Sequence, residues 1–342
     1  MKLKTIICAV LPALLFIGTN LKAQTITAVQ QPPLRTSIRG LSVVNDSVAW
    51  VSGSGGNVGI SNDGGKTWAW QQLKGYEKFD FRDVEAFSAK EAVIMSSGTP
   101  AVILKTTDGG ATWQEKYRKT DSVYFLDAMD FADKKHGFIM GDPINGKFLL
   151  LETKDGGETW TEMANAPAAL KGEAAFAASG TCLRADKQGI GLVTGGTASR
   201  LLTYSFKERT GWVVTDLKIL HGQQSQGAFS LASVKGTLVV GGDYAKPLRS
   251  DSTAEFYGTI IGYVGPARNL SRMHPVGFQS CVEYLNYGTY VSTGTPGSCI
   301  STDGGETWIK IDDKSYNVCR KAKKGTLVLF AGDRGKIGIY TP

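Results

Sequence analysis

The 342-residue sequence has few of the side chains and patterns that catalytic and cofactor sites commonly use. It contains three histidines, His136, His221 and His274, which lie far apart and form no HExxH pattern. No pair among its five cysteines has the CxxC spacing of a zinc site. It also lacks a Gly-x-Ser-x-Gly elbow and a Rossmann fingerprint between a strand and a helix. We therefore expect no metal ion and no nicotinamide or flavin cofactor.

Charge of one sign and long apolar runs are also scarce. The formal net charge is +7, and no dense Lys/Arg block with interleaved aromatic residues occurs. A balance this mild does not indicate a nucleic-acid partner. No long apolar stripe of 3.6-residue period appears either, so few helices are expected.

The one continuous apolar run lies at the amino terminus. A basic start, Met1 to Lys4, precedes an apolar stretch from Thr5 to Ile17, and Leu21-Lys22-Ala23 resembles a cleavage site. The run is short for a membrane span, and the pattern is typical of a secretory signal peptide. We expect residues 1–23 to be removed, leaving residues 24–342 as a single domain in the periplasm or outside the cell, with no membrane span; a retained anchor is the alternative.

What the sequence has in abundance is glycine, with 42 residues, and a repeated octapeptide. The pattern Ser/Thr-x-Asp-Gly-Gly-x-Thr-Trp occurs four times, at residues 61–68, 106–113, 153–160 and 301–308. The Gly-Gly pair supplies the positive φ of a tight turn, and the aspartate can accept hydrogen bonds from the same turn. The motif predicts hairpins in which four aspartates hold turns and four tryptophans enter the core: Asp63, Asp108, Asp155 and Asp303, with Trp68, Trp113, Trp160 and Trp308.

The spacing of the octapeptides predicts the architecture. The aspartates are separated by 45, 47 and 148 residues, and the last gap is close to three periods. One decayed copy is visible at residues 206–212, and another is expected near residues 254–262. An apolar strand followed by a small-residue turn recurs seven times at the same spacing. We predict an all-β fold, a seven-bladed β-propeller, rather than a β-sandwich with accidental repeats.

The last repeat lacks a fourth strand, and the start of the mature chain can provide it. Residues 26–31 resemble the strand that follows the first octapeptide, residues 68–73. The amino-terminal strand would complete blade seven, and closure of the ring would remove an exposed sheet edge. The propeller is expected to be a monomer.

Four cysteines remain after signal removal. Cys281 and Cys319 fall in equivalent strands of neighbouring repeats, so a disulfide between them is geometrically conceivable. The alternative is that Cys182, Cys281, Cys299 and Cys319 are all buried thiols.

The repeat register separates the octapeptides from the expected site. The octapeptides join third and fourth strands, whereas the turns between second and third strands, and the connections that lead into first strands, lie on the opposite face. Binding sites commonly occupy such variable loops on a rigid scaffold. The residues predicted to line this face, as a ligand site or as an ion-pair network between blades, are Arg39, Arg82, Asp127, Asp142, Glu173, Asp243, Tyr244, Ser280, Arg320 and Asp333.

The octapeptides resemble the Asp-box (BNR) repeats of sialidases and related propellers. The arrangement over the mature chain looks most like propellers related to the photosystem II stability/assembly factor, including a bacterial branch labelled oxidoreductase. That resemblance implies a scaffold that grips a protein client. The sialidase resemblance is more distant, because the Arg-Ile-Pro motif of those enzymes is absent.

Two functions follow as hypotheses. The first is an exported, non-catalytic propeller whose Arg/Asp-lined face holds a protein or a glycan. The second is a carbohydrate-active enzyme, a glycoside hydrolase or lyase, which needs two carboxyl groups flanking a sugar-sized cleft. The candidates for those groups are Asp83, Asp142, Glu173 and Asp243.

Overall fold

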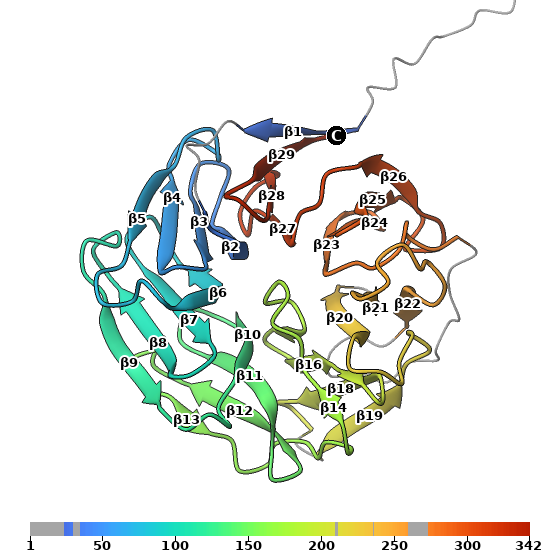
Figure 1. Ribbon diagram of the computed structural model, residues 1–342, viewed down its shortest axis with the longest axis horizontal. Helices are drawn as coiled ribbons and strands as arrows, with labels where there is room; N and C mark the ends of the chain where they lie inside the picture. The colour runs from blue at the N-terminus through green and yellow to red at the C-terminus, as the bar shows by residue number, and fades with distance from the viewer. Residues whose placement is uncertain (1–23, 30–34, 209–210, 235, 259–272) are drawn as a thin grey trace, which may run out of the picture.

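The computed structural model describes residues 24–29, 35–208, 211–234, 236–258 and 273–342; the predicted signal peptide lies outside them. The regular elements of these residues are all β-strands, grouped in seven sheets that surround a central channel (Figure 1). The prediction of an all-β, seven-bladed propeller is confirmed. Within the described residues there is no helix of the length and hydrophobicity needed to cross a bilayer.

The first three blades are regular antiparallel sheets with the first strand innermost. From the channel outward, blade 1 contains β2 (Ile38–Val43), β3 (Ala49–Gly53), β4 (Asn57–Ser61) and β5 (Ala69–Gln72). Blade 2 contains β6 (Asp80–Ala86), β7 (Ala92–Ser97), β8 (Ala101–Thr106) and β9 (Gln114–Lys119). Blade 3 contains β10 (Leu126–Phe131), β11 (Gly137–Ile144), β12 (Lys147–Thr153) and β13 (Thr161–Glu162).

Blades 4 to 6 follow the same order, but blade 5 is irregular: among the described residues it has three strands of this order instead of four, and it carries two additional strands. Two short strands, β14 (Glu173–Ala174) and β17 (Gly195–Gly196), extend the inner side of blade 5. Blade 4 contains β15 (Leu183–Ala185), β16 (Gly189–Val193), β18 (Arg200–Ser205) and β19 (Trp212–Asp216). The regular strands of blade 5 are β20 (Gln226–Ser233), β21 (Thr237–Asp243) and β22 (Ala254–Tyr257). Blade 6 contains β23 (Cys281–Asn286), β24 (Thr289–Gly294), β25 (Gly297–Ser301) and β26 (Ile309–Asp312).

Blade 7 joins the two ends of the chain. It consists of β27 (Val318–Lys321), β28 (Val328–Ala331), β29 (Ile337–Thr341) and, as its outer strand, β1 (Thr25–Val29). β1 runs antiparallel to β29, with Thr25 opposite Thr341 and Val29 opposite Ile337 (Figure 1). The predicted ring closure is therefore confirmed.

Each octapeptide lies in the turn between the third and fourth strands of its blade. In the first copy the Thr67 amide and hydroxyl donate to the two carboxylate oxygens of Asp63, at 2.9 and 2.6 Å, and the Gly65 amide donates to the Ser61 hydroxyl at 2.8 Å. The same bonds recur at Asp108, Asp155 and Asp303. These donors hold the pKa of Asp63 down at about 2.

The tryptophans that end the octapeptides lie between blades. Trp160 and Trp308 are buried, and Trp68 and Trp113 are half-buried. The decayed copy at residues 206–212 joins β18 to β19, the equivalent position of blade 4. β22 is the third strand of blade 5, and residues 259–272, where the other missing copy would end, lie outside the described residues.

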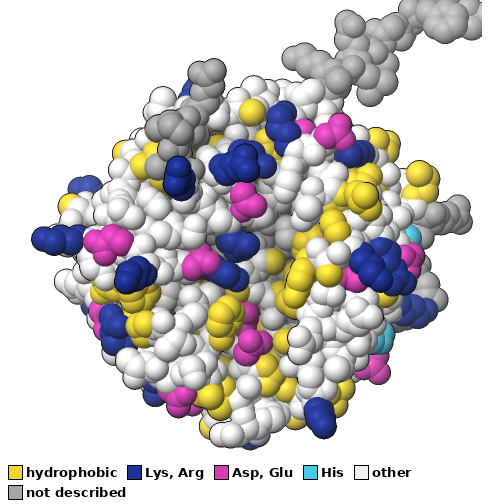
Figure 2. Space-filling model, viewed as in Figure 1, with side chains coloured by type: hydrophobic (Ala, Val, Ile, Leu, Met, Phe, Trp, Pro, Cys, Tyr) yellow, Lys and Arg dark blue, Asp and Glu magenta, His cyan; other side chains and the backbone are white. Residues whose placement is uncertain are grey.

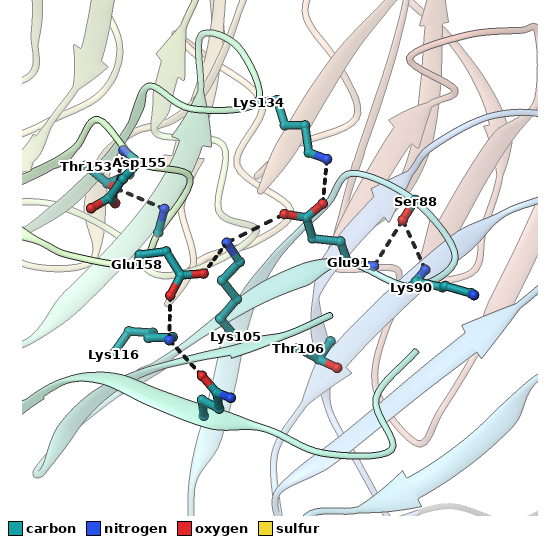
Figure 3. Close-up of polar contacts among 12 residues, drawn as sticks. Ser88, Lys90, Glu91, Lys105, Thr106, Lys116, Lys134, Thr153, Asp155 and Glu158 are labelled. Atoms are coloured by element: carbon teal, nitrogen blue, oxygen red, sulfur yellow. Dashed lines mark hydrogen bonds and ion pairs between the residues drawn. The ribbon is translucent and has the colours of Figure 1, made fainter. Parts of the chain in front are cut away.

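Ion pairs link blades 2 and 3 on the octapeptide face (Figure 3). Lys105 of β8 is 5% exposed, and its ammonium lies 2.8 Å from a carboxylate oxygen of Glu158 and 3.5 Å from one of Glu91. Lys116 pairs with Glu158, and Lys134 of blade 3 pairs with Glu91, each at 2.6 Å. Three of these four pairs cross between the blades, and the pair of Lys105 with Glu91 lies within blade 2, so the network holds the two blades in register.

The four cysteines among the described residues, Cys182, Cys281, Cys299 and Cys319, are free and buried, so the buried-thiol alternative is confirmed. Cys281 and Cys319 are neighbours on the innermost strands of blades 6 and 7, and the Cys281 thiol donates to the Cys319 carbonyl at 3.3 Å.

Candidate functional site

The channel is closed by a loop that the repeat pattern does not contain. Residues 175–182, which we call the plug, run from β14 to β15 through the centre of the ring (Figure 1). The Ser179 hydroxyl donates to the Ser280 carbonyl of blade 6 at 2.7 Å, and the Thr181 hydroxyl donates to that of Ser230 in blade 5 at 2.6 Å. The plug therefore converts an open channel into two separate mouths.

Gly180 allows the plug to reach the opposite wall. Its φ is +68°, and a Cβ there would lie 2.1 Å from a carboxylate oxygen of Asp83 on β6. That carboxylate is 1% exposed and accepts from the amides of Val84 at 2.8 Å and Met129 at 2.7 Å. Asp83 thus joins blades 2 and 3 beneath the plug.

On the face opposite the octapeptides the plug forms the floor of a cavity of about 470 Å3, which we call the channel-mouth cleft. Cationic, anionic and hydrophobic side chains gather around the hollow at the centre of the ring (Figure 2). Its lining includes Arg39, Arg82, Phe125, Asp127, Asp142, Phe176, Phe229, Tyr244, Phe278, Ser280, Asn317 and Asp333.

A repeated backbone irregularity directs four of these side chains into the cleft. The pairing of first and second strands slips by one residue in blades 1, 2, 3 and 5. The extra residues are Arg39, Arg82, Asp127 and Phe229, and all four line the cleft. A bulge leaves one residue outside the regular pairing and re-aims its side chain. The inner strands therefore present different chemistry from one equivalent position per blade.

Two arginines give the cleft a cationic side. The Nε of Arg82 donates to Asp80 at 2.7 Å, and its guanidinium lies over the Phe125 ring, 5.9 Å from the centroid. Arg39 donates to the Ser37 hydroxyl at 2.6 Å. Burial, and then the neighbouring charge of Arg82, lower the pKa of Arg39. The charges of Asp80 and Asp333 act on Arg39 in the opposite direction, but among the described residues no carboxylate pairs directly with it. Its guanidinium can therefore bind an anion.

Aromatic rings form the opposite side. Phe176 of the plug stacks on Phe229, with centroids 3.8 Å apart and planes at 8°. Phe278 meets Phe229 edge to face at 4.7 Å, and Tyr244, which is 51% exposed, lies at the margin. The rings come from the plug and blades 5 and 6, so an apolar group could be enclosed next to the cationic side.

Blade 3 contributes two acids. Asp127 is 1% exposed, and its Oδ2 has no hydrogen-bond partner in the described part of the chain. Asp142 accepts from the Ala175 amide at 3.2 Å. Burial raises the pKa of both carboxyls, and the charge of Asp142 adds to the rise at Asp127.

The structure brings most of the predicted face residues together. Seven of them line the channel-mouth cleft: Arg39, Arg82, Asp127, Asp142, Tyr244, Ser280 and Asp333. Asp333 accepts from the Ser37 hydroxyl at 2.5 Å and from the Asn317 amide at 2.9 Å, which supports Arg39 through Ser37.

Three predicted residues do not line the cleft. Glu173 was expected to lie directly before the first strand of blade 4, but the plug lies between them in the chain. The Glu173 carboxylate accepts a hydrogen bond from Arg200 Nε at 2.7 Å. Asp243 is fully buried and accepts from Gln226 at 3.1 Å and from the Ala245 amide at 2.9 Å. Arg320 lies at the other end of β27 from the cleft and lines the opposite mouth.

Three of the four acids proposed for a carbohydrate-active enzyme, Asp83, Glu173 and Asp243, therefore do not line the channel-mouth cleft. All three are at most 4% exposed and are held by protein donors. Of the four candidate acids, only Asp142 reaches the cleft. Within the described part of the chain, no group of three or more His, Cys, Asp or Glu side chains is placed to hold a metal ion.

Of the aromatic side, only Tyr244 was predicted from sequence, and the three phenylalanines were missed. Phe229 occupies the bulge position of Arg39 and Arg82, so alignment of the inner strands could have found it. Phe176 and Phe278 lie in the plug and in the connection before β23, where no repeat register applies.

The opposite mouth is a separate cavity of about 490 Å3 that shares no lining residue with the cleft. Its charges are largely paired: Arg184 donates to Glu283 at 2.9 Å, Arg320 lies 3.7 Å from the same carboxylate, and Lys323 pairs with Glu85. These pairs join blade 4 to 6, 6 to 7 and 7 to 2.

Comparison with known proteins gives a match to a family model and several similar solved structures. Residues 22–121 match the family model described as photosynthesis system II assembly factor YCF48. A solved structure of YCF48 bound to D1 peptide is 16% identical, with a TM-score of 0.63 over 95% of this chain and 97% of that one. YCF48 from Cyanidioschyzon merolae is 14% identical, with a TM-score of 0.63 over 92% and 98%.

A chain of the mitotic checkpoint complex is also similar, at 9% identity and a TM-score of 0.62 over 100% and 99% of the two chains. At these identities a structural likeness shows the fold alone. No curated protein matches the sequence. The family match at the amino-terminal part and the shared seven-bladed ring identify the chain as a propeller similar to the photosystem II assembly factor, which confirms the resemblance predicted from its repeats.

Proposed function

We propose that this protein is an exported, non-catalytic propeller that binds a segment of a partner protein in the channel-mouth cleft. The segment presents a carboxylate to Arg39 and Arg82 and an apolar side chain to the Phe176–Phe229 stack. The family match, and the peptide bound by the similar YCF48 structure, support a protein partner.

The observation that carries the proposal is the pair of guanidinium groups beside an aromatic wall. Charge-assisted hydrogen bonds from arginine to carboxylate are directional, and in a partly buried cleft they are stronger than at an open surface. The closed floor leaves room for a few residues of extended chain and prevents the segment from threading through the ring.

Replacement of Arg39 and Arg82 together by alanine is expected to weaken the binding of acidic peptides at least tenfold, because loss of hydrogen bonds to a charged group costs about 1.5–3 kcal/mol each. The measurement is fluorescence anisotropy with a tagged peptide library that places Asp or Glu next to Phe, Leu or Ile. A matched library carries Asn or Gln at the acidic position and should bind the wild-type protein weakly.

The matched control is the double variant Arg118→Ala and Arg249→Ala. Both of these arginines lie outside the cleft and pair with nearby acids, Glu115 and Asp251. The control changes net charge by the same amount and should bind like the wild type. Equal binding by the folded Arg39/Arg82 variant and the control would contradict the proposal.

Export is part of the proposal and rests on the signal-peptide pattern of residues 1–23. The protein recovered from the cell that makes it is expected to begin at Gln24. Intact-mass spectrometry of the purified protein would test this, and retention of Met1 to Ala23 would refute it.

A further inference from the structure

We propose that the Asp127 end of the channel-mouth cleft is a subsite for a positively charged nitrogen, the ammonium or guanidinium of a basic side chain in the bound segment. This inference rests on the proposed function, because it assigns a second contact to the same ligand. It makes the cleft bipolar: an anion binds on blades 1 and 2, and a cation binds on blade 3.

The first observation is an unsatisfied acceptor. Asp127 Oδ2 is buried, has no hydrogen-bond partner among the residues that the structure describes, and belongs to a residue that lines the cleft. Buried carboxylate oxygens are nearly always hydrogen-bonded, and an orphan carries a free-energy cost that a donor from a ligand would remove. The bulge at Asp127 is what turns this side chain toward the cleft instead of into the sheet.

The second observation is the neighbouring acid. Asp142 lines the same cleft, and its charge raises the pKa of Asp127. A cation placed beside two neighbouring carboxyls favours the ionised form of both. Arg82 acts on Asp127 in this direction, but its Nε is held by Asp80, and within the described residues no ion pair joins a basic side chain to Asp127 or Asp142.

The third observation is the aromatic surface beside the acids. Phe176 follows Ala175, whose amide holds Asp142, and the Phe125 ring lines the cleft with a guanidinium already over it. Aromatic faces attract alkylammonium and guanidinium groups, most strongly where water is excluded. Together the acids and rings suit an amphipathic cation more than a hydrated metal ion.

The charge state of Asp127 gives the subsite a pH signature. The groups that act on this carboxyl are Asp142 of β11, Arg82 of β6 and the Ala177 amide of the plug. Burial raises the pKa of Asp127, so below that value the carboxyl is protonated and a cation must displace the proton. Cation affinity should therefore rise with pH through the raised pKa and level off above it, with a proton released on binding.

The test uses two small probes with the full mature chain: phenethylamine for the cationic subsite and 3-phenylpropionate for the arginine pair. Isothermal titration calorimetry in buffers of different ionisation enthalpy measures affinity and proton release. We expect Asp127→Asn to weaken phenethylamine binding at least fivefold and to abolish its pH dependence. Asp142→Asn should also weaken it at least fivefold, but should move the pH profile to lower pH, because the charge of Asp142 raises the pKa of Asp127. Asp313→Asn, at an exposed residue outside the cleft, is the control and should change neither.

The two proposals fail differently. If Asp127→Asn and Asp142→Asn bind phenethylamine like the wild type, the cation subsite is refuted, while loss of 3-phenylpropionate in the Arg39/Arg82 variant would still support the proposed function. If the Arg39/Arg82 variant binds 3-phenylpropionate as tightly as the wild type does, the proposed function is refuted. If Asp127→Asn does not fold, the inference is tested with Asp142→Asn and with the pH dependence of phenethylamine binding to the wild type. A phenethylamine affinity of the wild type that does not change with pH would overturn the inference.

Discussion

Gly180→Ala is expected to displace the plug and destabilise the propeller by about 3–5 kcal/mol, combining overpacking with the strain of a left-handed backbone. The new methyl group would lie 2.1–2.5 Å from the atoms of the Asp83 carboxylate. That carboxylate cannot move aside without breaking its bonds to the Val84 and Met129 amides. The loop itself must therefore leave, and with it the floor of the cleft.

Gly75→Ala separates the two contributions. Gly75 has φ +86°, and a Cβ there would meet nothing within 4 Å. This control should carry the backbone strain alone, about 1–2 kcal/mol. Urea unfolding gives the two free energies, and titration with 3-phenylpropionate reports on the cleft. Equal free energies of unfolding for the two variants would show that Gly180 is not tightly packed against Asp83. Unchanged 3-phenylpropionate binding by folded Gly180→Ala would show that the plug does not form the floor of the cleft.

The repeats predicted the ring because they are local and periodic. Each octapeptide specifies a turn through its own hydrogen bonds, such as those from Thr67 to Asp63, so the count of turns gives the count of blades. The register of those turns also separates the two faces, and this placed seven of ten predicted residues around one cleft.

The plug could not be predicted in this way because its contacts are non-local. Ser179 binds a carbonyl 101 residues away, and Gly180 packs on Asp83 across the channel. Without the plug, the register places Glu173 at the start of an inner strand, although it is paired with Arg200 instead. The burial of Asp83 and Asp243 also depends on contacts between distant parts of the chain, so the sequence does not show that these two acids are inaccessible.

The bulges in the inner strands could be predicted from the sequence only in part. A one-residue slip before Gly40 or Ala128 leaves no composition signal, yet it decides that Arg39 and Asp127 face the cleft rather than the sheet. Comparison of inner strands blade by blade suggests the equivalence, and the pairing register is needed to show it.

Ring closure gives the other large expected effect. Ile26 is the one fully buried side chain of β1: it is 6% exposed and packs over Gly338 and beside Tyr316. Ile26→Asp would place an unpaired carboxylate in this contact, and we expect a loss of about 2–4 kcal/mol. Release of β1 would also expose the edge of β29, so the variant should self-associate.

Thr27→Asp is the matched control, because Thr27 is the next residue of the same strand and faces solvent. It introduces the same charge and should change stability by less than about 0.5 kcal/mol. Urea unfolding measures the difference, and size-exclusion chromatography with light scattering measures association. If Ile26→Asp matched Thr27→Asp in both, the pairing of β1 with β29 would contribute little to the ring, and closure would have to come from packing between blades 7 and 1.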